Sequence, residues 1–184
     1  MDRAIVERAQ RGDHRAFEQL ALASASRLDV VARLITRDPE RASDAVQDTL
    51  VRAWRDLPTL RDPDRFEAWL RRLLVHACMD VIRRSRRWSV EVELADVHSG
   101  KGDMTTNVGN RDAIERAFGR LDPDLRAIIV LHYYVDLTLP DVAEALGVAE
   151  GTVKSRLHRA LGEMRLVIAP PSMGRVDSAG EQVR

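Results

Sequence analysis

The segment from Leu137 to Arg165, LTLPDVAEALGVAEGTVKSRLHRALGEMR, constrains the fold more than any other part of the chain. Thr138 can cap a short helix over 140–146, and Gly147 supplies the positive-φ position that ends it. A second helix is expected to start near Glu150. The apolar positions have the spacing of a helix-turn-helix, with a small residue where the helices approach: Val142, Ala143, Leu146, Val148, Val153 and Leu157.

One face of the second helix of this pair is polar and is not needed for packing in the hydrophobic core. Its side chains can contact base edges and phosphates: Thr152, Lys154, Ser155, Arg156, His158 and Arg159. The alternative is a solvated amphipathic helix in a bundle. The turn glycine, the core spacing and the basic second helix occur together here, and this coincidence favours a DNA-reading unit.

The rest of the chain also reads as helical. Aromatic residues make up only 4% of it, and Ala, Leu and Arg are abundant. Three Asp-Pro pairs each place an N-cap acceptor before a proline at the first helical position, which predicts helices from Pro39 to about Arg55, Pro63 to about Arg87 and Pro123 to about Val135. An earlier helix is expected over Arg15 to Ile35, and the predicted fold class is all-α.

The helical pattern divides the chain into two small domains. Between residues 89 and 111 the apolar periodicity fades and Gly, Ser, Thr, Asn and Asp accumulate, which indicates a flexible linker. Residues 169–184 are too polar and too rich in Pro and Gly to pack, so a disordered tail is expected. The predicted domains are 1–88 and 112–168.

The formal net charge is zero, but the charges are segregated. Seven Arg lie between residues 65 and 87 against two acidic residues, whereas five acidic residues lie between 89 and 112 against two basic ones. A further hypothesis is that the acidic linker folds back over a basic face in the free protein. This hypothesis predicts that a neutral linker would strengthen DNA binding by the free protein.

The expected helix over residues 65–87 is amphipathic. One face carries apolar residues, and the opposite side carries a polar, mostly basic stripe: Arg72, His76, Asp80, Arg83 and Arg87. Such a stripe can follow a DNA backbone. A solvated Arg-rich face and a polybasic membrane patch are the alternatives.

The preceding helix has an outward face that starts acidic, with Asp44 and Asp48, and ends basic, with Arg52 and Arg55. An acidic patch repels DNA, so a basic protein surface is its natural partner. Ordinary N-terminal carboxylates favoured by the helix dipole are the other interpretation.

Several classes of protein are disfavoured by the sequence. Cys78 is the single cysteine, so no internal disulfide or paired-cysteine metal site is expected, and it fits a small core residue. The five histidines are scattered, and nucleophile, metal-ligand or phosphate-loop spacing is not found, so neither an enzyme nor a cofactor is expected. The sequence shows neither a signal peptide nor a membrane span, which predicts a cytoplasmic protein without membrane insertion.

Three blocks together resemble a known family: SDAVQDTLVRAW, FEAWLRRLLVHACMDVIRRSRR and the helix-turn-helix segment. They are similar to the extracytoplasmic-function (ECF) sigma factors of bacterial RNA polymerase, over about residues 16–87 and 121–165. The resemblance implies a sigma factor that joins core RNA polymerase, brings it to promoter DNA and melts it, and that is held by an anti-sigma factor. It does not indicate which promoters, signal or inhibitor are involved.

The resemblance also implies roles for particular residues. The first domain, region 2, would bind polymerase through Asp44, Gln47, Asp48 and Arg52. Its last helix and the loop 59–65 would read the minus 10 element, through Arg65, Arg72, His76, Asp80, Arg83, Arg84 and Arg87. The second domain, region 4, would read the minus 35 element in the major groove, through the face from Thr152 to Arg159 given above, with Lys154, Ser155, His158 and Arg159 at the reading positions.

The chain departs from the family pattern in two places. His76 stands where the family commonly has Asn, so the position is carried over without a base preference. The segment after AFEQL lacks the usual aromatic residues. Two alternatives explain part of the pattern without binding to polymerase. The first is a helix-turn-helix repressor or response-regulator effector domain, which binds duplex DNA. The second is a membrane-surface adaptor that uses the basic residues 83–87.

Overall fold

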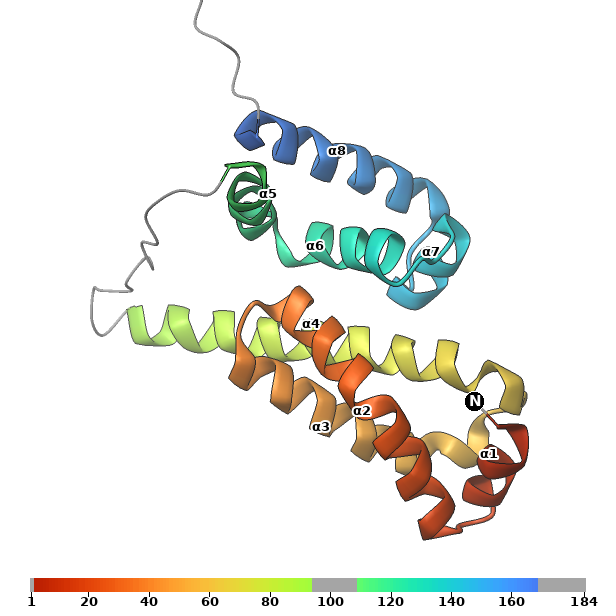
Figure 1. Ribbon diagram of the computed structural model, residues 1–184. Helices are drawn as coiled ribbons and strands as arrows, with labels where there is room; N and C mark the ends of the chain where they lie inside the picture. Colours follow the sequence, from red (N-terminus) through yellow and green to blue (C-terminus); the bar gives the residue numbers. More distant parts are fainter. Residues whose placement is uncertain (1, 94–108, 169–184) are drawn as a thin grey trace, which may run out of the picture.

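The computed structural model describes residues 2–93 and 109–168, with side chains for 2–85 and 112–168, and all regular elements in these ranges are helices (Figure 1). In the first half these are α1 (Arg3–Gln10), α2 (His14–Thr36), α3 (Pro39–Asp56), η1 (Leu57–Thr59), η2 (Pro63–Arg65) and α4 (Phe66–Glu93). In the second half they are α5 (Gly109–Arg120), α6 (Pro123–Ile129), the π-helical turn η3 (Val130–Tyr134), α7 (Leu139–Leu146) and α8 (Glu150–Ile168).

Side-chain caps explain several of the helix starts. Asp38 accepts hydrogen bonds from the backbone N–H groups of Glu40 and Arg41 at the start of α3, and Asp62 accepts from Asp64 at η2, as predicted. At the third Asp-Pro pair the helix begins at Pro123 as predicted, but the side chain of Asp122 makes no capping hydrogen bond to α6. Its Oδ2 atom lies 3.9 Å from Arg159 Nη2 of α8.

Two boundaries differ from the prediction. Helix α4 continues to Glu93, past the expected domain end at residue 88, because the sequence from 88 to 93 contains neither Gly nor Pro to stop it. Helix α5 begins at Gly109, inside the segment expected to be linker. The acidic-linker hypothesis and the tail prediction for 169–184 concern segments that lie largely or wholly outside the described residues.

The first half is a helical bundle in which α2, α3 and α4 pack against one another. The buried line of α3 consists of small residues, Ala42, Ala45, Thr49 and Ala53, which allow the helices to approach closely. Cys78 of α4 is fully buried in this core, as predicted, and burial raises the pKa of its thiol to about 12.

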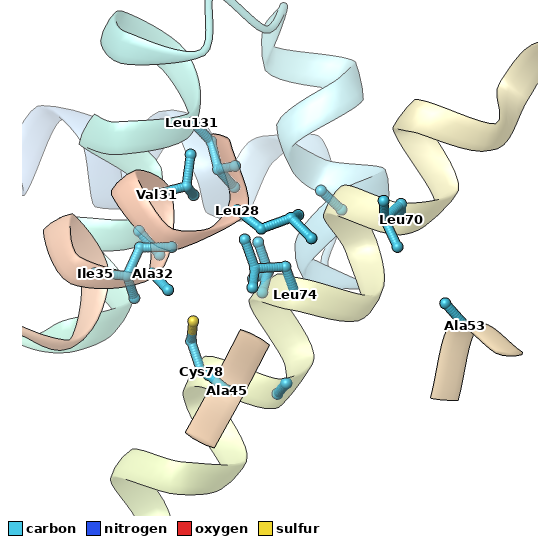
Figure 2. Packing of buried hydrophobic residues seen from close by; sticks show 14 of the residues in the cluster. Leu28, Val31, Ala32, Ile35, Ala45, Ala53, Leu70, Leu74, Cys78 and Leu131 are labelled. Carbon is cyan, nitrogen blue, oxygen red and sulfur yellow. The ribbon is translucent and has the colours of Figure 1, made fainter. Parts of the chain in front are cut away.

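The second half folds around α8, against which α5, α6 and α7 all pack. Leu121, Leu125 and Ala160 form a separate small core there. The two halves also share one continuous core, because buried residues of η3 and α7 join the cluster of the first half. Figure 2 shows Leu131 of η3 beside Val31 and Leu28 of α2.

Candidate nucleic-acid interface

The connection between α7 and α8 has the geometry of a helix-turn-helix. Gly147 adopts φ 65°, and its N–H donates to the carbonyl oxygens of Ala143 and Glu144. The N–H of Val148 donates to the Ala143 oxygen at 3.1 Å, which completes the αL ending of α7. Thr138 caps the start of α7 as predicted. The sequence prediction of this unit is confirmed.

The predicted reading face of α8 divides into two parts. Lys154, Ser155, His158 and Arg159 are exposed, and they are the four residues expected at reading positions. Thr152 and Arg156 are half-buried, and the guanidinium of Arg156 lies 3.7 Å from the Asp124 carboxylate of α6. The two half-buried residues therefore offer less surface to a ligand than the other four.

The exposed Lys and Arg side chains of α8 form ion pairs with acidic residues of the same helix. The Lys154 ammonium lies 2.7 Å from the Glu150 carboxylate, and Arg159 Nε donates to Glu163 at 2.8 Å. Exposed pairs of this kind contribute little stability, so phosphate groups can replace the carboxylates at small cost.

The polar stripe of α4 lies on the surface as expected. Arg72, His76, Arg83 and Arg84 are exposed and Asp80 is half-buried, while Arg65 is exposed in η2. The side chain of Arg87 lies outside the described residues. Although the ring is exposed on one side, desolvation by the surrounding protein and the nearby Arg72 lower the pKa of His76, against the opposing effect of Asp80, which favours the neutral imidazole.

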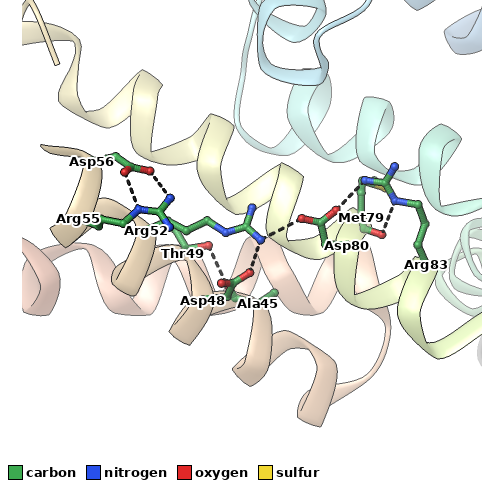
Figure 3. A network of polar contacts seen from close by, with 9 residues as sticks. All are labelled: Ala45, Asp48, Thr49, Arg52, Arg55, Asp56, Met79, Asp80 and Arg83. Carbon is green, nitrogen blue, oxygen red and sulfur yellow. Dashed lines mark hydrogen bonds and ion pairs between the residues drawn. The ribbon is translucent and has the colours of Figure 1, made fainter. Parts of the chain in front are cut away.

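A chain of ion pairs joins α3 to this stripe (Figure 3). Arg52 Nη2 lies 2.7 Å from the Asp48 carboxylate and donates to Asp80 at 3.0 Å. The other oxygen of Asp80 accepts from Arg83 at 2.8 Å. Burial opposes ionisation of Asp80, but the hydrogen bond and charge of Arg52, with those of Arg83, outweigh it and lower the pKa of this carboxyl.

This network was missed by sequence reasoning, which assigned Arg52 to a protein surface and Asp80 to DNA. The structure places the two side chains against each other and brings four of the expected site residues into one row. The acidic face of α3 is otherwise open, since Asp44 and Gln47 are exposed and Asp48 is half-buried.

The ion pairs of three acidic residues in the second half were also not predicted. The carboxylate of Glu144 in α7 lies 3.6 Å from Arg65 and 3.7 Å from Arg72, two residues expected at the minus 10 element. Asp122 and Asp124 lie beside the cations of α8. Such pairs join separate elements, so helical spacing in the sequence does not reveal them.

A helix-turn-helix and a second helix with an exposed, mostly basic face, in a chain whose described elements are all helical, are typical of a DNA-binding protein. Two family models match the chain: sigma-70 region 2 over residues 20–88 and sigma-70, region 4 over residues 111–164. The ECF RNA polymerase sigma factor SigM of Mycobacterium tuberculosis is 39% identical over 149 residues, which cover 81% of this chain and 75% of SigM. The RNA polymerase sigma-H factor of Pseudomonas aeruginosa is 31% identical, over 86% of this chain and 89% of that protein.

Solved structures agree with these relatives. CnrH, solved in complex with the cytosolic domain of CnrY, matches with a TM-score of 0.64 at 32% identity, over 93% of this chain and 99% of CnrH. RpoE of Bartonella quintana, solved with the anti-sigma factor NepR, shares the fold with a TM-score of 0.66 at 24% identity, over 84% of this chain and 98% of RpoE. The chain belongs to the ECF sigma factors of bacterial RNA polymerase.

As a sigma factor, the protein directs core RNA polymerase to promoters. The family assignment accounts for both halves of the chain, whereas a helix-turn-helix repressor leaves residues 15–87 unexplained. Among the helices described here, none is both long and apolar enough to cross a membrane.

Proposed function

We propose that the two halves act as separate promoter-reading modules, residues 1–88 as region 2 and 112–168 as region 4, held at a fixed separation by core polymerase. Linking two weak sites raises the effective concentration of the second site once the first is engaged. The observation that carries the proposal is the pair of exposed cationic helix faces, one on α4 and one on the second helix of the helix-turn-helix.

The acidic face of α3 docks on polymerase. Asp44 and Gln47 are exposed there, and Asp48 and Arg52 lie at its edge. Charge complementarity with a basic protein surface would steer this contact and fix its register. Asp48 and Arg52 also belong to the row of ion pairs that ends at Arg83. The side chains that dock on polymerase are therefore adjacent to those that contact DNA.

The stripe of α4 and the η2 segment recognise the minus 10 element and help to separate its strands. Arg65, Arg72, Arg83, Arg84 and Arg87 supply charge for phosphates, and His76 with Asp80 supplies groups able to contact a base. A base read in melted DNA must leave the stack, at a cost of a few kcal/mol that protein contacts have to offset. The neutral His76 can both donate and accept a hydrogen bond.

The exposed face of α8 enters the major groove of the minus 35 element. Lys154 and Arg159 can donate to guanine, and Ser155 and His158 can contact bases or phosphates. Thr152 and Arg156 support this face from its buried side.

The protein works without catalysis or cofactor of its own, in the cytoplasm with polymerase. An anti-sigma factor controls it, a proposal supported by the structure of RpoE, which was solved with the anti-sigma factor NepR. In vitro transcription with core polymerase over fragmented genomic DNA tests the whole proposal. Defined start sites that require the protein support it, and transcription that is unchanged by the protein on every template contradicts it.

A further inference from the structure

Helix α1 packs against the loop that precedes α4. It contacts η1 and η2, the two short helices of that loop, and it also contacts α2 (Figure 1). Val6 and Ala9 form its buried face. The roles proposed above for α3, α4 and α8 do not involve α1, yet the loop that it contacts includes the segment 59–65 expected at the minus 10 element.

The side chain of Gln10, the last residue of α1, holds the backbone of this loop. Its Nε2 donates to the carbonyl oxygen of Leu60 at 2.6 Å and to that of Leu57 at 3.3 Å. The Leu57 oxygen also accepts from the N–H of Leu60 at 3.1 Å. Gln10 therefore binds the two residues that close the turn of η1, and it supplies a donor to the extended residue that follows this turn.

The position of Gln10 is restrained by contacts between α1 and α2. Arg8 Nε and Nη2 both donate to Asp13 Oδ2, at 2.9 and 2.6 Å. The other carboxylate oxygen of Asp13 accepts from the backbone N–H of Ala16 and caps α2. Together with the buried face of α1, these contacts connect the end of this helix to the start of α2.

The loop presents polar side chains to solvent. Leu57 and Pro63 are buried near its two ends, whereas the exposed residues between and after them are Thr59, Arg61, Asp62 and Arg65. A loop that is held only at its ends samples several conformations. Holding its backbone in one conformation before DNA arrives removes this ordering cost from recognition.

We propose that α1 belongs to the minus 10 recognition unit and that Gln10 is a positioning residue, which fixes the loop 57–65 in the conformation that reads DNA. This inference rests on the proposed role of the loop at the minus 10 element. Gln10 acts through the backbone of Leu57 and Leu60 and not through a contact of its own with DNA. Its loss should therefore impair recognition of the minus 10 element and spare that of the minus 35 element.

The mobility of the loop tests the positioning contact without DNA. A nitroxide label attached to the cysteine of an Arg61→Cys protein reports nanosecond motion of the loop, and Cys78 stays unlabelled because it is fully buried. Gln10→Met keeps an unbranched side chain of similar length but removes the amide donor, so the label should become more mobile. Gln19→Met, at an exposed position of α2, is the matched control and should leave the spectrum unchanged.

Promoter discrimination tests the consequence for recognition. Holoenzyme formed from core polymerase and the full chain is assayed on a promoter obtained from genomic fragments, and on versions of it with substitutions in either element. Gln10→Met should lower the preference for the intact minus 10 element by about fivefold, the effect of roughly one net hydrogen bond. The preference for the intact minus 35 element and co-elution with core polymerase should stay unchanged.

Gln10→Lys provides a rescue by a second donor. Its ammonium group can donate to both carbonyl oxygens, so this variant should recover most of the minus 10 preference. The preference is a ratio between two templates of equal charge, so the added positive charge affects both alike.

Equal label mobility in Gln10→Met and Gln19→Met would overturn the proposal. So would an unchanged minus 10 preference, or a parallel loss at both elements, which would make Gln10 a residue of general stability. Failure of the proposed function has a different signature, because wild-type holoenzyme would then show no preference for any minus 10 sequence. The inference would fall with it, whereas a wild-type preference that Gln10→Met retains refutes only the role of Gln10.

Discussion

Arg126 Nε donates a hydrogen bond to the carbonyl oxygen of Ile35, 2.9 Å away and 91 residues earlier in the chain. Ile35 lies in the last turn of α2, where carbonyl groups lack partners within the helix and the helix dipole is negative. A guanidinium from the second half therefore caps a helix of the first half. This contact connects the stability of one domain to the position of the other.

The first prediction concerns this cap. Arg126→Met keeps an unbranched apolar stem but leaves the buried Ile35 carbonyl oxygen without its donor, which costs about 1–3 kcal/mol. Urea unfolding followed by circular dichroism should show a lower midpoint. Arg84→Met, on an exposed position of α4, is the matched control and should leave the midpoint nearly unchanged. Equal midpoints for the two variants would remove Arg126 from the stabilising contacts.

The second prediction separates backbone strain from packing. Gly147 has φ 65°, and a Cβ there would meet no atom within 4 Å, so Gly147→Ala should destabilise by about 1 kcal/mol through strain alone. Gly162 of α8 also has open space around its Cβ position but lies inside a helix. Gly162→Ala should stabilise by up to about 1 kcal/mol. Thermal unfolding of both variants tests the opposite signs.

Local sequence signals predicted the helices because each signal acts within one turn. Asp38, Thr138 and Gly147 mark their helix ends through contacts to nearby backbone atoms. Helix α1 could have been found in the same way, since Asp2 caps it and Gly12, with φ 90°, follows its end. The helix after Asp122 also begins where its Asp-Pro pair predicts, at Pro123, although the Asp122 side chain makes no capping hydrogen bond.

The site was predicted as a set of helix faces, and its internal connections were not. Helical periodicity can be read from the sequence, and it predicts the exposed residues of α8: Lys154, Ser155, His158 and Arg159. The contact between Arg52 and Asp80 depends on how α3 crosses α4, which no spacing rule specifies. The same holds for Glu144 against Arg72, which depends on how two separate domains pack.

The third prediction distinguishes two neighbouring acids on α3. Asp44 is exposed, so Asp44→Lys should weaken association with core polymerase and leave the unfolding midpoint unchanged. Asp48 is half-buried beside Arg52, so Asp48→Lys should lower stability as well, by about 1 kcal/mol. Size-exclusion co-elution with core polymerase and urea unfolding measure the two effects. Normal co-elution of the Asp44→Lys protein would contradict docking through this face.

The fourth prediction concerns the exposed face of α8. Lys154→Ala and Arg159→Ala should each weaken binding to the preferred minus 35 element by about five- to 150-fold if the lost contact is to a base. If the contact is to phosphate, the loss should be uniform across sequences and the salt dependence should become shallower. Glu163→Ala, which removes only the partner of Arg159, is the control. Promoter selectivity that is unchanged in both alanine variants would remove these residues from the reading face.

The fifth prediction tests the ion pair between Arg52 and Asp80. Arg52→Asp should weaken the packing of α3 on α4, and adding Asp80→Arg to it should restore part of the loss, with a coupling below about 1 kcal/mol because both groups are about a third exposed. Since the folded state lowers the pKa of Asp80, its contribution is present above the carboxyl's ordinary pKa and is lost as pH falls through the lowered value. Urea unfolding at neutral and acidic pH should therefore show the coupling near pH 7 and a smaller one in acid.

The neighbouring pair Arg55 and Asp56 lies within one chain segment, so reversing it should show no such coupling between helices. A double variant no more stable than Arg52→Asp at neutral pH would show that this contact does not hold the two helices together.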